Sequence, residues 1–297
     1  MKLVTFKTSN NTTSAGVVRE ERVLPLNYPT LLELLQDPDG MECARRLLAS
    51  DEQGLALGEI KLLTPVPNPP TMRDFYAFEQ HVAAARAKRG LGMIPEWYDI
   101  PTFYFANTSE IYGHGEPVPY PVGSKELDIE LEIACVIGRG GKDLSVEEAA
   151  DYIAGYTIMN DWSARDFQRL DMKLNLGPGK GKDFATSLGP WLVTTDELVS
   201  RRTGSGSGER YDMTMLARVD GQEISRGNFN QIYYSFPQII AHASRNVRLC
   251  PGDVVGSGTV GTGCLLEIGT SIHPWFQRGE TIELEIDRIG FLRNTIV

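Results

Sequence analysis

Leu127–Ile137 (LDIELEIACVI) is the stretch of sequence that decides the fold class. Apolar residues alternate along it with a period of two, which predicts a β-strand with one face against a core. The residues on that face are Ile129, Leu131, Ile133, Cys135 and Ile137. The opposite face begins with Glu130 and Glu132, so the same strand is expected to present two neighbouring carboxylates.

These two carboxylates are the first feature that indicates chemistry. Two carboxylates on one spot repel each other, and one tends to protonate unless a cation neutralises both. Oxygen ligands favour Mg²⁺, Ca²⁺ or Mn²⁺ over zinc. The alternative is that Asp128, Glu130 and Glu132 form the solvated face of an edge strand, and the pair alone favours that interpretation.

The surrounding sequence predicts two unequal parts. Residues 1–66 combine short strand patterns with two short helices within Leu31–Leu48, and a proline cluster at 65–70 ends this small N-terminal α+β domain. Residues 67–297 form the second, strand-rich domain. Its further strand candidates are 102–106, 154–159, 191–194, 213–219, 254–260, 264–268 and 281–289, and helices are expected at 145–152 and 236–244. The fold class is therefore α+β, built on a folded-over sheet.

Composition limits the possible partners. The 297 residues have a formal net charge of -10, which disfavours nucleic acid and anionic membranes as partners. An anionic substrate then needs a local cation. The four cysteines are widely spaced, and the interpretation is buried thiols. No apolar run approaches the length of a membrane span, so we expect a cytoplasmic protein.

Two more acidic residues stand in informative positions. Asp161 follows an apolar strand and is either a ligand or a helix N-cap. Asp74 and His81 are seven residues apart, a spacing that would place them on one face of a helix. Taken alone, His81 is better explained as a surface or capping histidine.

Two glycine-rich segments complete the candidate residues. Residues 177–186 (GPGKGKDFAT) lack the spacing of a phosphate-binding loop, and Lys182 either approaches an anion or is a solvated loop lysine. Residues 256–263 (GSGTVGTG) permit close approach of the backbone to a ligand. Glu267 follows on an expected strand and points either to solvent or into a pocket.

Taken together, these segments resemble the fumarylacetoacetate hydrolase (FAH) superfamily from about residue 70 to residue 294. Each motif is weak alone, whereas six motifs in the family's order are a specific signal. They are DFYxxxQH at 74–81, ExE at 130–132, MNDWSARDxQ at 159–168, GKxFxTxxxPW at 181–191, GSGT at 256–259 and LLE at 265–267.

The resemblance implies a mixed β-sheet roll or sandwich as the catalytic domain, with the small N-terminal domain attached. It also implies that Asp74, Glu130, Glu132 and Asp161 bind a divalent cation. Mg²⁺ is the first choice, with Mn²⁺ or Ca²⁺ as alternatives. A homodimer is expected from the resemblance alone.

The resemblance further assigns roles around the metal. The residues are His81 as general base, Glu267 as its orienting partner, Lys182 as a catalytic cation, and Arg165, Gln168 and Thr259 as substrate-binding groups. One position departs from the family pattern. Eukaryotic fumarylacetoacetases place a tyrosine four residues after the glutamine, where this chain has Met172, so fumarylacetoacetate itself is disfavoured as the substrate.

The predicted activity is hydrolysis of a carbon–carbon bond in a small anionic 1,3-dicarbonyl or acylpyruvate-type acid. His81 and Glu267 together favour hydrolysis, because a decarboxylase needs no activated water. The alternative is a lyase on the same scaffold, either an oxaloacetate decarboxylase or a 2-keto-3-deoxy sugar-acid dehydratase. A non-catalytic binding protein is the remote alternative, because every ligand position of the resemblance is intact.

Overall fold

The computed structural model describes residues 1–297, and its largest element is a twelve-stranded sheet. Its main path runs in the order β4-β3-β2-β1-β14-β12-β10-β20-β6-β7, while β5 pairs with β1 and β8 pairs with β14. The strands are β1 (Lys2–Thr8), β2 (Thr13–Arg19), β3 (Arg22–Pro25), β4 (Leu55–Ala56), β5 (Ile60–Leu62), β6 (Met72–Phe75), β7 (Phe103–Phe105), β8 (Ile111–Tyr112), β10 (Leu131–Ile137), β12 (Ile153–Asp161), β14 (Thr186–Thr194) and β20 (Val254–Gly256).

A four-stranded antiparallel sheet and three short strand pairs complete the β-structure. The four-stranded sheet has the order β18-β17-β21-β22. Its strands are β17 (Thr214–Val219), β18 (Gln222–Asn228), β21 (Thr281–Ile286) and β22 (Gly290–Thr295). The pairs are β9 (Leu127–Asp128) with β13 (Ser163–Ala164), β11 (Gly141–Lys142) with β19 (Arg248–Leu249), and β15 (Arg202–Thr203) with β16 (Arg210–Tyr211).

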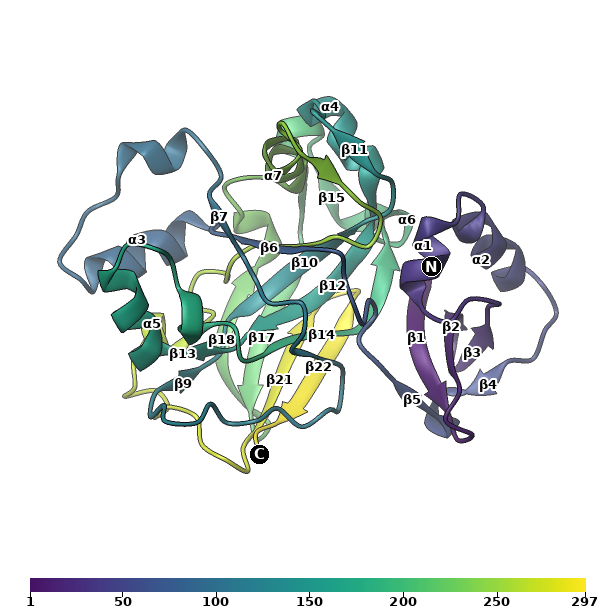
Figure 1. The fold of residues 1–297 in the computed structure, drawn as a ribbon, viewed down its shortest axis with the longest axis horizontal. Coiled ribbons are helices and arrows are strands. Elements are labelled where there is room, and N and C mark those ends of the chain that lie inside the picture. Colours follow the sequence, from purple (N-terminus) through teal and green to yellow (C-terminus); the bar gives the residue numbers. More distant parts are fainter.

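The helices are short and lie around the margins of the sheets (Figure 1). They are α1 (Leu31–Gln36), α2 (Gly40–Leu48), α3 (Glu79–Ala87), α4 (Val146–Ala149), α5 (Arg165–Lys173), α6 (Thr195–Leu198), α7 (Phe236–Ala243) and α8 (Leu265–Ile268). Helices begin in both predicted segments, α4 and α7, and each starts with a capping box, formed by Ser145 and Ser235. None of these helices has the length and apolar composition needed to cross a membrane.

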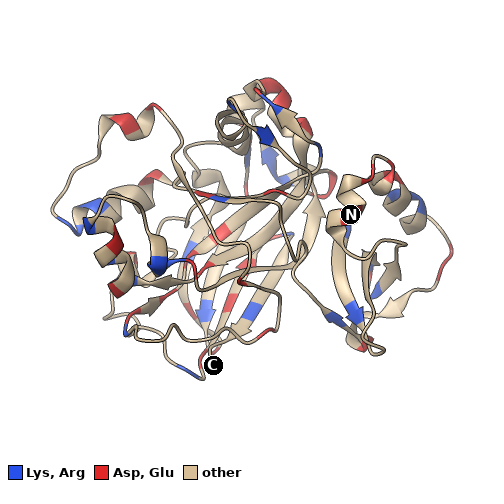
Figure 2. Cartoon of the chain, viewed as in Figure 1, with Lys and Arg blue, Asp and Glu red and all other residues tan.

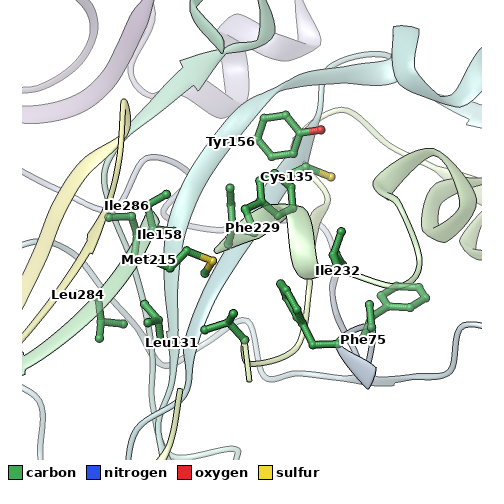
Figure 3. Packing of buried hydrophobic residues seen from close by; sticks show 14 of the residues in the cluster. Phe75, Leu131, Cys135, Tyr156, Ile158, Met215, Phe229, Ile232, Leu284 and Ile286 are labelled. Atoms are coloured by element: carbon green, nitrogen blue, oxygen red, sulfur yellow. The ribbon is translucent and has the colours of Figure 1, made fainter. Parts of the chain in front are cut away.

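The main core lies between the two sheets, which confirms the α+β fold. Ile133 and Cys135 of β10 share one buried cluster with Met215 of β17 and Ile286 of β21. Figure 3 shows Ile158 of β12 and Met215 beside Ile286 in this layer. Two sheets packed face to face bury the inward side chains of both.

Strand β10 lies in the interior of the large sheet, hydrogen-bonded to β12 on one side and β20 on the other. The prediction of a strand over 127–137 is confirmed for Leu131–Ile137, whereas residues 129 and 130 interrupt it and Leu127–Asp128 forms the separate strand β9. The alternative of a solvated edge strand is wrong, because Glu130 and Glu132 are both buried.

The N-terminal residues extend the large sheet. Leu31–Leu48 forms two helices, α1 and α2, as predicted. Strand β1 pairs antiparallel with β14, with Lys2 opposite Val193 and Leu3 opposite Leu192. One hydrophobic cluster joins residues of α1 and β1 to residues of β10 and β14. The domain boundary at residue 66 stays a prediction.

Residues 264–268 differ from the sequence-based expectation. The segment was expected to be a strand, but Leu265–Ile268 forms the short helix α8. The spacing of the apolar residues in so short a segment fits either element: a strand places Leu266 and Ile268 on one face, and one helical turn also separates Leu265 from Ile268. The correction matters because α8 contains Glu267.

We expect Ile158→Ala to lower the free energy of unfolding by about 2–5 kcal/mol, because the side chain is fully buried between the sheets. Chemical denaturation would measure the loss. Ile272→Ala is the matched control, since Ile272 is 60% exposed. Equal losses in the two variants would contradict the assigned core.

Candidate metal centre and active site

Four carboxylates meet at one end of the large sheet. Asp74 lies on β6, Glu132 on β10, and Asp161 at the end of β12, while Glu130 immediately precedes β10. All four are buried, and each offers an oxygen within 4.8 Å of the oxygens of the others. Neighbouring strands of one sheet thus bring together residues that are far apart in the chain.

Two sequence-based alternatives are settled here. Asp74 and His81 do not share a helix face, because Asp74 lies on β6 whereas His81 lies on α3. Asp161 is not a helix N-cap, since Ala164 occupies that position before α5. Asp161 instead ends β12 with its side chain in the carboxylate cluster.

Burial and mutual repulsion shift the acidity of the cluster. Burial, followed by the charge of Asp161, raises the pKa of Asp74 to about 8. Burial and the charges of Asp74 and Glu130 raise the pKa of Glu132 well above its usual value. Burial also raises the pKa of Asp161, although Lys182 opposes the shift. These groups therefore resist being charged together without added positive charge.

Glu130 behaves in the opposite way. Burial acts to raise its pKa, but the charges of Lys182 and Arg165 outweigh burial and hold the pKa below its usual range. Lys182 Nζ lies 2.8 Å from Glu130 Oε2, and Arg165 Nη1 lies 2.8 Å from Glu130 Oε1. Glu130 is thus the carboxylate that stays ionised at neutral pH.

The donor set fits a divalent cation. Glu132 Oε1 and Asp161 Oδ1 are buried without any hydrogen-bond partner. Buried unpartnered carboxylate oxygens are costly, and a cation would satisfy them. Hard oxygen ligands are those that Mg²⁺, Mn²⁺ and Ca²⁺ prefer. The residues at this site could therefore hold a divalent cation.

Two glycines of the glycine-rich segment 256–263 lie close against the carboxylates. A Cβ atom at Gly256 would lie 2.5 Å from Asp74 Oδ1, so a side chain there would displace this carboxylate. Gly258 has a φ of +77° and donates its N–H to both Asp74 and Glu132, at 3.1 Å each. Glycine permits this backbone conformation and the close approach.

Lys182 is part of the cluster rather than a solvated loop lysine. It follows a turn of 3-10 helix at Gly179–Gly181, is buried, and pairs with Asp161 as well as Glu130. Burial acts to lower its pKa, but Asp161 and Glu130 outweigh burial and raise it. Lys182 therefore remains a cation beside the carboxylates.

His81 and Glu267 form a buried pair next to the cluster. His81 Nδ1 contacts Glu267 Oε1, and the two residues come from the helices α3 and α8. The backbone N–H of Thr262 donates to Glu267 Oε2 at 2.8 Å, and the Cys264 thiol lies 3.7 Å from Oε1. Both carboxylate oxygens are thus fixed, and His81 Nε2 faces away from the pair.

The three predicted substrate-binding residues occupy different environments. Arg165 is buried at the start of α5, and its Nη1 donates to Gln168 Oε1 at 2.8 Å. Arg165 Nη2 is buried without a partner. Thr259 is also buried, and its Oγ1 donates to the carbonyl oxygen of Leu131 at 3.2 Å.

Sequence analysis missed Tyr104 and the role of Asp128. The Tyr104 hydroxyl on β7 donates to Asp161 Oδ2. Asp128 binds Arg165 Nε at 2.8 Å. Tyr104 belonged to an expected strand without any further signal, and Asp128 was treated only as part of a solvated face.

Comparisons with known proteins agree with this geometry. Residues 71–297 match the family described as fumarylacetoacetate (FAA) hydrolase, C-terminal. Oxaloacetate tautomerase fahd2, mitochondrial, from Xenopus laevis is 31% identical over 288 residues, covering 92% of this chain and 79% of that protein. Fumarylacetoacetase from Arabidopsis thaliana is 35% identical over 217 residues, covering 59% of this chain and 51% of that protein. The chain therefore spans about half the length of the Arabidopsis relative.

A solved structure shows the same fold. Maleylpyruvate hydrolase from Sphingobium sp. SYK-6, in complex with manganese (II) ion and pyruvate, superposes with a TM-score of 0.73 at 22% identity. The match covers 100% of this chain and 99% of that chain.

We expect the affinity for Mn²⁺ to increase between pH 6 and pH 8. Asp74, with a pKa of about 8, and Glu132 hold protons in the metal-free protein, and these protons compete with the ion. As the pH rises towards 8, Asp74 loses its proton in a growing fraction of the molecules and the competition weakens. Calorimetric titration at several pH values would measure the affinity, and Glu132→Gln should weaken binding and flatten its pH dependence.

An affinity that is constant or falls over this range would contradict the assigned cluster. Glu223→Gln is a suitable control, because Glu223 pairs with Arg226 on β18, outside the cluster.

Proposed function

The chain belongs to the fumarylacetoacetate hydrolase family, and on this premise we propose that it is a metal-dependent hydrolase of small acylpyruvate-type acids. Members of this family are enzymes that act on small acid substrates. The proposed reaction adds water across a carbon–carbon bond between a carbonyl carbon and the methylene group of a pyruvate unit. One product is a carboxylic acid and the other is a 2-oxo acid.

Asp74, Glu130, Glu132 and Asp161 would hold the cation. When bound, a divalent cation polarises the oxygens of a 2-oxo acid and stabilises negative charge that develops on them. Mg²⁺ is the proposed ion, with Mn²⁺ or Ca²⁺ as alternatives. The manganese and pyruvate in the Sphingobium structure support a 2-oxo acid beside the metal.

The buried His81–Glu267 pair is the observation that supports hydrolysis best. Because Nδ1 donates its proton to Glu267, Nε2 is left with a lone pair that can accept a proton from water. The hydroxide formed in this way attacks the distal carbonyl carbon. Glu267 stabilises the positive charge on the imidazole while it holds the proton.

The cations beside the carboxylates complete the proposed mechanism. Lys182 remains protonated, so it can stabilise the oxyanion or donate a proton to the carbon that leaves with the pyruvate unit. Arg165 has a buried N–H group without a partner, which suits a carboxylate oxygen of the substrate. Gln168 fixes the guanidinium from the side. Thr259 is proposed to contact the substrate carboxylate.

Substrate selection is proposed to depend on the segments near His81 and on α5. The last turn of α3 and the residues after it are basic, with Arg86, Lys88 and Arg89, and blue segments lie at the left of Figure 2 in this region. Met172 lies on α5, one turn beyond Gln168, and is 42% exposed. The basic segment suits an anionic substrate, and Met172 lacks the hydroxyl of the tyrosine in fumarylacetoacetases.

Tautomerisation of oxaloacetate is the second candidate, and the similarity to the Xenopus tautomerase over 92% of this chain favours it. The same site serves that reaction if His81 moves a proton between carbon and oxygen without activating water. A decarboxylase or dehydratase would likewise use the metal and Lys182. These reactions differ from hydrolysis in whether an oxygen atom of water enters the product.

We expect Mg²⁺- or Mn²⁺-loaded protein to cleave an acylpyruvate and metal-stripped protein to be inactive. His81→Ala should lower kcat by about a hundredfold or more, because it removes the base that activates water. Absorbance of the dicarbonyl would follow turnover. His273→Ala serves as the control, since His273 contacts Pro274 and Glu280 outside the site.

The substrate panel decides between the reaction classes. It contains an acylpyruvate, fumarylpyruvate, oxaloacetate and a 2-keto-3-deoxy sugar acid, with turnover in ¹⁸O-labelled water. Label in the carboxylic acid product supports hydrolysis. Turnover of oxaloacetate or the sugar acid alone would move the reaction to a tautomerase or lyase, and an unaffected rate in His81→Ala would exclude His81 as the base.

A further inference from the structure

Asp128, which lies outside the proposed catalytic residues, accepts four hydrogen bonds. It is fully buried on β9. Its Oδ1 accepts from the backbone N–H groups of Ile129 and Leu265, at 2.8 Å each. Its Oδ2 accepts from the N–H of Leu266 at 3.0 Å and from Arg165 Nε at 2.8 Å. One carboxylate therefore joins β9, the start of α5 and the start of α8.

The contact with α8 fixes the helix that holds Glu267. This helix has four residues, and its own N-cap residue, Cys264, makes no capping hydrogen bond with its side chain. A helix this short is not stable without support, and its first N–H groups need acceptors. Asp128 supplies the acceptor for the first two of them, and its negative charge suits that end of a helix.

The contact with Arg165 fixes the guanidinium on the side away from Glu130 and Gln168. Arg165 Nη1 binds Glu130 and Gln168, whereas Nε binds Asp128. Two carboxylates on different edges of the guanidinium define its plane. Removal of one of them would leave Arg165 attracted to Glu130 alone, towards the metal cluster.

We propose that Asp128 is a positioning residue for two parts of the site. It positions the water-activating pair through α8, and it positions the substrate-binding arginine directly. This inference rests on the proposed function of those residues. Asp128 touches neither His81 nor the four carboxylates of the cluster directly. Its effect on binding would pass through Arg165, and its effect on turnover through Glu267.

Double-mutant cycles separate this role from a general loss of stability. The variant is Asp128→Asn, which keeps the size of the side chain and one acceptor oxygen. With Mn²⁺-loaded protein, pyruvate binding should weaken about tenfold or more in the wild-type background. In the Arg165→Met background, Asp128→Asn should weaken pyruvate binding by less than about twofold. Calorimetry would measure both dissociation constants.

The second cycle uses kcat for acetylpyruvate. Asp128→Asn should lower kcat by about ten- to a hundredfold alone, and by less than about twofold when Glu267 is already glutamine. Asp166→Asn is the control, because Asp166 is likewise an acceptor of backbone N–H groups, those of Lys125 and Phe167, but binds Ser124 instead of Arg165. Equal fold-changes in both backgrounds of either cycle would overturn the proposal.

Amide hydrogen exchange tests the role of Asp128 without any substrate. The amide protons of Leu265 and Leu266 should exchange at least about tenfold faster in Asp128→Asn, while those of central β10 stay protected. If that variant does not fold, Arg165→Met provides the same test, since Asp128 then loses the guanidinium that holds it.

Unchanged exchange at Leu265 and Leu266 would overturn the role of Asp128. A wild-type protein that neither binds pyruvate nor cleaves acetylpyruvate would instead count against the proposed function, and the exchange measurement would still decide the role of Asp128.

Discussion

The burial of four carboxylates at one point is the constraint on which the rest of this structure depends. A buried charge is costly unless opposite charge or hydrogen-bond donors compensate it. Lys182 and Arg165 provide positive charge on the side of Glu130, and Gly258 donates an N–H to Asp74 and Glu132. Two oxygens still have no partner. A cation bound here would supply the remaining compensation, and the glycines leave room beside the carboxylates.

The period-two alternation of apolar residues was sufficient to predict the central strand of the fold and two of the four carboxylates. Alternation along Leu127–Ile137 places Glu130 and Glu132 on one face, and this relation depends only on local geometry. Sequence could not show that β10 is an interior strand, because pairing with β12 and β20 is a tertiary property. The choice between an edge strand and a buried ligand pair therefore needed the other motifs, whose order along the chain indicated the family.

Other features depended on long-range contacts and were missed or misassigned. Lys182 lies in a glycine-rich segment, and only its packing against Asp161 and Glu130 makes it a buried cation. Residues 265–268 are too few for their apolar spacing to distinguish a strand from a helix, and Asp128, far away in the sequence, supplies the acceptors that favour the helix. Tyr104 can contact Asp161 because β7 pairs with β6 in a register that places Tyr104 opposite Asp74, another member of the cluster. Local patterns carry no information on such partners.

The position of β6 in the sheet has a consequence for how the protein is made. Asp74 is separated from Glu130 and Glu132 by β20, and Gly256 of β20 lies opposite Asp74 in a parallel pairing. A growing chain on the ribosome therefore contains all four carboxylates long before it contains the strand that brings the first of them to the others. The complete cluster can assemble only after residue 256 has left the exit tunnel. A cation site that needs all four carboxylates would therefore form only after β20 has been made, and a nascent chain that stops before β20 would lack it.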